Sequence, residues 1–84
     1  MINAARKVSE LNECLCNELE EYFKRLEGHS VVGLYDMVIE EVEKSLFKSV
    51  MKYANNNQTI ASTVLGISRG TLRKKLRQYG LVSG

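Results

Sequence analysis

The sequence has no proline, no tryptophan, only two cysteines and a single histidine among its 84 residues. The absence of proline and the scarcity of β-branched runs favour an all-helical chain. No apolar run approaches the roughly 18 residues that a membrane-spanning helix needs, and no signal-peptide pattern is present. We therefore expect a soluble, cytoplasmic protein.

Groups that carry catalysis or bind metals are scarce. His29 falls in an expected turn, and no Gly-rich phosphate loop or nucleophile with a positioned base is present. Cys14 and Cys16 lie about 200° apart around a helix axis, so they cannot share a metal ion, and we expect buried or half-buried thiols. The acidic cluster at 40–43 is typical of a solvated helix face. We therefore expect a protein that has no enzymatic activity and binds neither a metal nor a cofactor.

Acidic residues are absent from the last part of the chain. Residues 1–48 hold six Lys/Arg and ten Asp/Glu, whereas residues 49–84 hold six Lys/Arg and no acid. The formal charge is −4 in the first part and +6 in the second. An acidic body joined to a cationic end suggests nucleic acid or an anionic membrane surface as the partner, and charge alone does not choose between them.

Helical periodicity is what the sequence has in abundance. In the first part apolar residues recur every three or four positions, at Val8, Leu11, Leu15, Leu19, Tyr22 and Leu26. Gly28 suits the left-handed position that ends a helix, and Ser30 is a candidate cap for a second helix over about 31–54. Residues 1–10 form a short tail or an extension of the first helix.

The second helix has an apolar arc too wide for one buried stripe. In a chain of this length the expected cover is a second copy, which gives a two-fold homodimer of intertwined helices; a monomeric bundle is the alternative. The domain organisation is therefore a tail over 1–10, dimerisation helices over 11–54 and a cationic region over 55–84.

The three asparagines at 55–57 can close the second helix and open a third over about 58–65. A fourth begins at Ser68 or Arg69 and runs to Tyr79, before Gly80. Two short helices joined by "GIS" fit a helix-turn-helix. The residues expected to lock the two helices together are Ala61, Leu65, Ile67 and Leu72.

The fourth helix carries basic side chains and no acid. Leu72, Leu76 and Tyr79 share a narrow arc, and Lys74 and Arg77 lie roughly opposite it. We expect Arg69, Arg73 and Lys75 to flank Lys74 and Arg77 on an exposed cationic face. Like charges stacked on three turns are compensated by a polyanion. Double-stranded DNA is favoured, because its major groove admits a helix and that of A-form RNA does not. Gly70 lowers the helix propensity of this segment. Close approach of another backbone would explain why a glycine stands at this position.

The stretch "NNQTIASTVLGISRGTLRKKLRQYG", preceded by "LYDMVIEEVEKSLFKSVMKYA", closely resembles the Fis family of bacterial nucleoid-associated proteins over about residues 15–81. The resemblance implies a homodimer whose two recognition helices enter successive major grooves and bend the DNA, with weak and partly indirect sequence preference. It implies base contacts for Ser68, Arg69 and Lys74. Phosphate contacts are implied for Asn57, Thr59, Thr71, Arg73 and Arg77, and near Gln78.

The sequence departs from the family pattern at several positions. Ser68 replaces an asparagine, and Ile60 and Gln78 replace basic residues. The resemblance also implies an RNA polymerase contact near the loop before the third helix, where Asn55 and Asn56 replace basic residues or glycine. Family members that activate recombinases have a longer leader with a β-hairpin arm, so we expect weak or no stimulation of a DNA invertase by this chain.

Two alternative hypotheses for the function remain. The cationic end is also similar to the DNA-binding domain of NtrC-type enhancer-binding activators, although the starting methionine favours a whole small protein. A helical protein-interaction module would use the acidic part to recruit partners. That module would bind DNA no better than any basic peptide.

Overall fold

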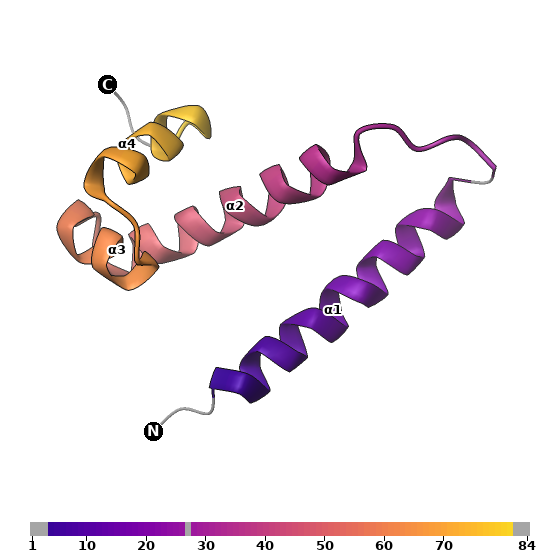
Figure 1. Ribbon diagram of the computed structural model, residues 1–84, viewed down its shortest axis with the longest axis horizontal. Helices are drawn as coiled ribbons and strands as arrows, with labels where there is room; N and C mark the ends of the chain where they lie inside the picture. The colour runs from indigo at the N-terminus through magenta and orange to yellow at the C-terminus, as the bar shows by residue number, and fades with distance from the viewer. Residues whose placement is uncertain (1–3, 27, 82–84) are drawn as a thin grey trace. The chain divides into compact units, whose positions relative to one another are not determined.

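The computed structural model describes residues 4–26 and 28–81 and is drawn in Figure 1. These ranges hold four helices and no strand: α1 (Ala4–Arg25), α2 (Leu34–Tyr53), α3 (Gln58–Leu65) and α4 (Arg69–Gln78). The all-α prediction is confirmed. The chain divides into two compact units, Met1–Val32 and Gly33–Gly84, and each is described by itself.

Within residues 4–26 and 28–32, the described part of the first unit, there is a single helix, α1. This helix begins at Ala4, so residues 4–10 extend it. The described residues of this unit hold no second element that could pack on α1, and several of its apolar side chains are exposed, with Val8 65% and Leu11 66% exposed. Cys14 and Cys16 are also exposed, so the expectation of buried or half-buried thiols is wrong for this unit.

The segment before α2 differs from the sequence-based expectation. Gly28 adopts the predicted left-handed conformation, with φ of 87°, and His29 is exposed as expected. Ser30 does not cap the next helix. Instead α2 begins at Leu34, and its cap is Gly33, which has φ of 74° and offers no side-chain hydrogen bond. The left-handed backbone at Gly33 ends the helix in the amino-terminal direction, because α-helical φ is negative.

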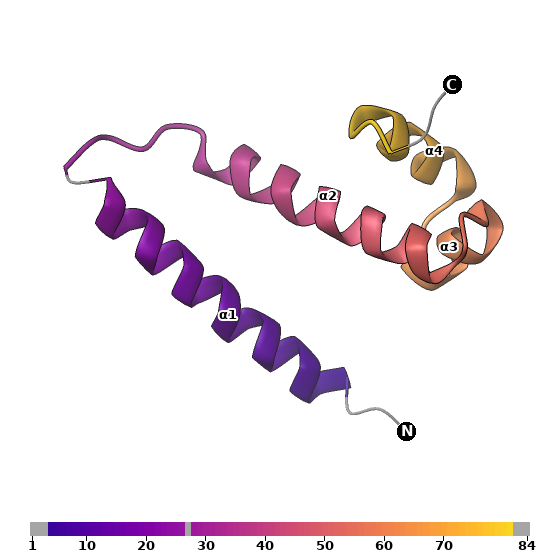
Figure 2. The same ribbon diagram turned by 180° about the vertical axis from the view of Figure 1, so that it is seen from behind.

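The second unit is built around α3, which packs against both α2 and α4. Figures 1 and 2 show α3 at the carboxyl end of α2 and α4 returning alongside α2. The buried core consists of side chains from all three helices and the loop after α2: Phe47, Met51, Ala54, Ala61, Leu72 and Leu76. None of the helices in the described ranges is long and apolar enough to cross a membrane.

The apolar arc of α2 is covered only in part within this unit. Phe47 and Met51 are buried near its carboxyl end, where α3 and α4 pack. Further toward the amino end Val42 is 43% and Tyr35 76% exposed, and Leu46 is 47% exposed. The second unit therefore leaves an apolar surface on α2 that its own core does not cover.

Candidate nucleic-acid interface

The entry into α3 is made by three asparagines, as the sequence predicts. Asn55 and Asn56 adopt positive φ of 53° and 64°, a conformation that asparagine tolerates better than most residues. Asn57 is the N-cap, and its Oδ1 accepts a hydrogen bond of 3.1 Å from the backbone N–H of Ile60. This bond satisfies one of the free amides at the start of α3.

The turn between α3 and α4 is closed by backbone and side-chain hydrogen bonds. Gly66 has φ of 75° and donates its N–H to the Ser62 carbonyl at 2.9 Å. Ser68 is the N-cap of α4, where its Oγ accepts from the Thr71 N–H at 3.1 Å. The predicted helix-turn-helix is present, and the start of α4, which the sequence left between Ser68 and Arg69, is Arg69.

Apolar contacts fix the angle between these two helices. Ala61 and Leu72 are fully buried, and Leu65 and Ile67 pack against the same core while staying partly exposed. Ser62 is buried too, at 7% exposure, and its Oγ donates to the Thr59 carbonyl at 2.9 Å. The small residues on α3 leave room for Leu72 of α4. The four residues predicted to lock the helices together do so.

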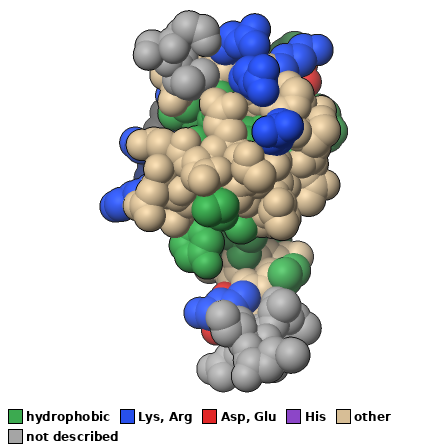
Figure 3. Space-filling view, turned by 90° about the vertical axis from the view of Figure 1, so that its left-hand side faces the viewer, with side chains coloured by type: hydrophobic (Ala, Val, Ile, Leu, Met, Phe, Trp, Pro, Cys, Tyr) green, Lys and Arg blue, Asp and Glu red, His purple; other side chains and the backbone are tan. Residues whose placement is uncertain are grey.

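The side chains predicted to contact DNA are exposed. These residues are Asn57, Thr59, Ser68, Arg69, Thr71, Arg73, Lys74 and Arg77. The structure brings two of them into direct contact across the two helices, because Nη1 of Arg69 donates to Oγ1 of Thr59 at 3.5 Å. Figure 3 looks onto the end of the unit formed by α3 and α4, where Lys and Arg side chains border a face of uncharged groups.

Ser68 uses its hydroxyl within the protein. Besides accepting from the Thr71 N–H, its Oγ donates to the Thr71 Oγ1 at 3.0 Å. The Ser68 hydroxyl is therefore already engaged in two hydrogen bonds within the protein. Serine is among the residues preferred at the N-cap, so the sequence already contained the signal for this cap.

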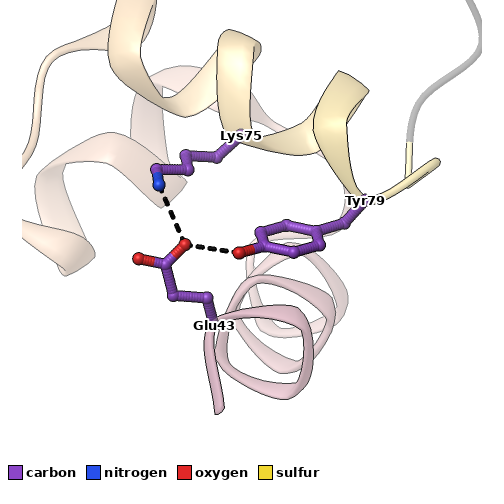
Figure 4. A network of polar contacts seen from close by, with 3 residues as sticks. All are labelled: Glu43, Lys75 and Tyr79. Atoms are coloured by element: carbon purple, nitrogen blue, oxygen red, sulfur yellow. Dashed lines mark hydrogen bonds and ion pairs between the residues drawn. The ribbon is translucent and has the colours of Figure 1, made fainter. Parts of the chain in front are cut away.

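Lys75 does not belong to the exposed cationic face on which the sequence placed it. Its Nζ lies 2.9 Å from Oε1 of Glu43 on α2, and its side chain is 31% exposed. The hydroxyl of Tyr79 donates to the same oxygen at 2.6 Å, as Figure 4 shows. Among the described residues, the exposed basic side chains of α4 that form no ion pair are Arg69, Arg73, Lys74 and Arg77.

This network was missed by sequence reasoning, because Glu43 lies 32 residues before Lys75 and 36 before Tyr79. The Tyr79 ring also stacks on Phe47, with ring centroids 6.3 Å apart. Hydrogen bonds from Tyr79 and then Lys75 lower the pKa of the Glu43 carboxyl. The hydrogen bond to Glu43, with burial and the negative charges of Glu43 and Glu40, raises the pKa of Tyr79 to about 12.

Gly70 lies on the exposed side of the first turn of α4. A Cβ built there would meet only Oγ of Ser68, 4.0 Å away. The close approach that the sequence suggested for Gly70 is therefore not made by another part of the described chain. What the surface offers is a cationic helix whose amino-terminal turn is open to an external partner.

Comparisons with known proteins agree with this geometry. The family model described as "Bacterial regulatory protein, Fis family" matches residues 38–79. A putative Fis-like DNA-binding protein from Neisseria meningitidis serogroup A is 48% identical over 73 residues, 87% of this chain and 92% of the relative. A putative Fis-like DNA-binding protein from Ralstonia nicotianae is 43% identical over 72 residues, which cover 86% of this chain and 94% of the relative. The DNA-binding protein Fis of Pectobacterium carotovorum is 43% identical over 82 residues, which cover 95% of this chain and 84% of the relative.

Proposed function

Because the chain belongs to the Fis family of bacterial regulatory proteins, we propose that it is a transcription regulator that binds double-stranded DNA by placing α4 in the major groove. The observation that carries this proposal is the surface of α4. Four basic side chains lie on it without an ion pair among the described residues, while Leu72 and Leu76 hold its other side in the core. The relatives from Ralstonia nicotianae and Pectobacterium carotovorum are named as DNA-binding proteins.

The roles follow from position along α4. Arg69 stands in the first turn, where its guanidinium fork can bond the two major-groove acceptors of guanine, and Lys74 follows on the outward face. Ser68, with its hydroxyl engaged in two hydrogen bonds within the protein, contributes less to base readout than these two. The residues proposed to hold phosphates are Asn57, Thr59, Thr71, Arg73 and Arg77.

A homodimer is the second part of the proposal. The support is the uncovered apolar surface of α2, including Val42 and Leu46, which would remain in water in a single chain. A second copy related by a two-fold axis can cover the same surface on both chains at once. Residues 11–54 would then be the dimerisation helices, and the two copies of α4 would reach two successive turns of the duplex.

DNA bending is the third part. Two recognition helices held closer together than one helical turn require the duplex to bend, and sequences that bend easily are then preferred. We propose a nucleoid-associated, cytoplasmic regulator of this kind. The exposed loop with Asn55 and Asn56 is the proposed place for a contact with RNA polymerase.

The test is a gel-shift titration on circularly permuted duplexes of one length, run beside sedimentation of the free protein. A two-subunit complex whose mobility depends on the position of the site is expected. A free monomer with absent or position-independent shifts would instead support the helical interaction module. A dimer that binds DNA but shows no position-dependent mobility would support the DNA-binding part of the proposal and contradict the bending part.

A further inference from the structure

We propose that Glu43 is a positioning residue for the DNA-reading helix, and that by holding Lys75 it keeps one cation of α4 away from the DNA backbone. The inference rests on the proposed function, since it assumes that α4 contacts DNA. It assigns a role in binding to a carboxylate on α2, outside the helix-turn-helix.

The geometry of the contact supports a positioning role. One oxygen of Glu43 accepts from both Lys75 of α4 and Tyr79, the C-cap residue of α4, which lie four residues apart. Figure 4 shows the two donors reaching the carboxylate of α2 from the same helix. Sliding or rotating α4 would lengthen at least one of the two bonds. The stack of Tyr79 on Phe47 resists the same movements from the apolar side.

The contact also attaches the carboxyl-terminal part of α4 to α2, beside the apolar packing of Tyr79 against the core. Leu72 and Leu76 anchor the middle of the helix, and the caps at Ser68 fix its beginning. Lys75 and Tyr79 hold the carboxyl-terminal part to α2. A helix held at its middle and at its carboxyl-terminal part keeps its amino-terminal turn, which carries Arg69, in a constant orientation.

The position of Lys75 separates it from the other basic residues of α4. Around the helix axis Lys75 lies about 60° from the buried Leu72, whereas Lys74 lies about 160° from it. The side chains of Lys75 and Glu43 are 31% and 27% exposed, so neither is free in solvent. A lysine whose charge is already balanced releases few counterions when DNA binds.

The experiment compares four variants of the full chain with the wild type: Lys75→Ala, Glu43→Gln, Tyr79→Phe and the double variant Glu43→Gln/Lys75→Ala. Arg77→Ala is the matched control, because Arg77 is an exposed basic residue of the same helix that is proposed to hold a phosphate. Fluorescence anisotropy measures affinity for a preferred and a non-preferred duplex at several salt concentrations. Circular dichroism establishes that each variant is folded.

For the control we expect the magnitude of the log–log salt slope to fall by about 1 per subunit. Lys75→Ala is expected to leave the slope unchanged and to lower the ratio of preferred to non-preferred affinity about tenfold. Glu43→Gln releases Lys75, so the slope should steepen by about 1 per subunit, and the double variant should restore it. Tyr79→Phe, the mildest change, should lower the affinity ratio at an unchanged slope.

Two results would overturn the inference while leaving the proposed function intact. One is a Lys75→Ala slope reduced as much as that of Arg77→Ala, which would make Lys75 a phosphate contact. The other is a Glu43→Gln protein with wild-type slope and wild-type ratio, which would make the carboxylate a fold contact only. A wild-type chain with no salt-dependent DNA affinity would overturn both the inference and the proposed function.

Discussion

The guanidinium of Arg69 lies 3.5 Å from the hydroxyl of Thr59 and so joins the first turn of α4 to the first turn of α3. The amides in the first turn of a helix are only partly used within it, and they attract anions. Asn57 and Ser68 each satisfy one of these amides from a side chain. Two helix starts and one arginine therefore share an exposed surface that suits the phosphates and base edges of DNA.

Arg69 and Arg77 are expected to contribute in different ways. Arg69→Ala should cost about 1–3 kcal/mol of binding and flatten sequence preference, because a bidentate base contact discriminates between bases. Arg77→Ala should weaken binding to all sequences about equally, because phosphates are the same everywhere. Competition gel shifts with several duplexes measure both effects. Equal losses on every duplex for both variants would refute this division of roles.

DNA binding should depend strongly on salt. If each subunit neutralises about four phosphates, a dimer is expected to show a log–log salt slope of roughly −7. Anisotropy titrations over a range of salt concentrations measure this slope. A slope near −2 would indicate the few charge contacts of a protein-interaction module with a basic tail.

Gly70→Ala should have opposite effects on stability and binding. Alanine favours the helix by about 1 kcal/mol, and the added Cβ meets no protein atom closer than 4.0 Å. In the complex the same methyl group would occupy space next to the DNA, at an expected cost of about 1–3 kcal/mol of binding. Urea unfolding and gel shifts on the same variant measure the two effects. Unchanged DNA affinity would show that no backbone approaches Gly70.

Ser68→Ala should destabilise the fold. The Ser68 hydroxyl accepts from the Thr71 N–H, and losing such a cap costs about 1 kcal/mol. The control is Thr63→Ala, which removes an exposed side-chain bond to the Thr59 carbonyl without removing a cap. Its expected effect is within about 0.5 kcal/mol. Urea unfolding compares the variants, and equal stabilities would contradict the capping role.

Stability should respond to pH at both ends of the scale through Glu43 and Tyr79. The folded pKa of Glu43 is lowered from its ordinary 4.5, so its contribution is present above about pH 4.5 and is lost as the pH falls through the lowered value. The folded pKa of Tyr79 is raised from 10.0 to about 12, so its contribution is present below pH 10 and is lost as the pH rises toward 12.

Urea unfolding at a series of pH values tests both limbs. The difference in stability between the wild type and Glu43→Gln should shrink as the solution becomes acidic. The difference between the wild type and Tyr79→Phe should shrink above pH 10. Differences that stay constant across these ranges would mean that neither group titrates differently in the folded and unfolded chain.

The helices and their ends in the cationic part were predictable, because the signals are local. The arc of Leu72, Leu76 and Tyr79 has the helical period, Asn57 is a cap, and Gly66 permits the left-handed turn. The eight proposed DNA contacts were predicted from the same periodicity and from resemblance, and all of them are exposed.

Other features depended on segments distant in the sequence. Lys75 was predicted to join the exposed cations, since its angle on α4 is intermediate between the buried and open sides. Packing of α4 on α2 brings it within 2.9 Å of Glu43, a residue that no local period links to it. The start of α2 was misplaced because Ser30 and Gly33 are both acceptable helix starts, and the left-handed backbone selects Gly33.

By itself the sequence determined the all-helical class, the helix-turn-helix and the charge of α4, because these arise from spacing and composition within a few turns. Only the tertiary structure decided which basic residues of α4 are open to a partner and which one is held by α2. The physical reason is that a side chain at the border of a helix face pairs with whatever the neighbouring helix presents. For Lys75 that neighbour is the Glu43 carboxylate.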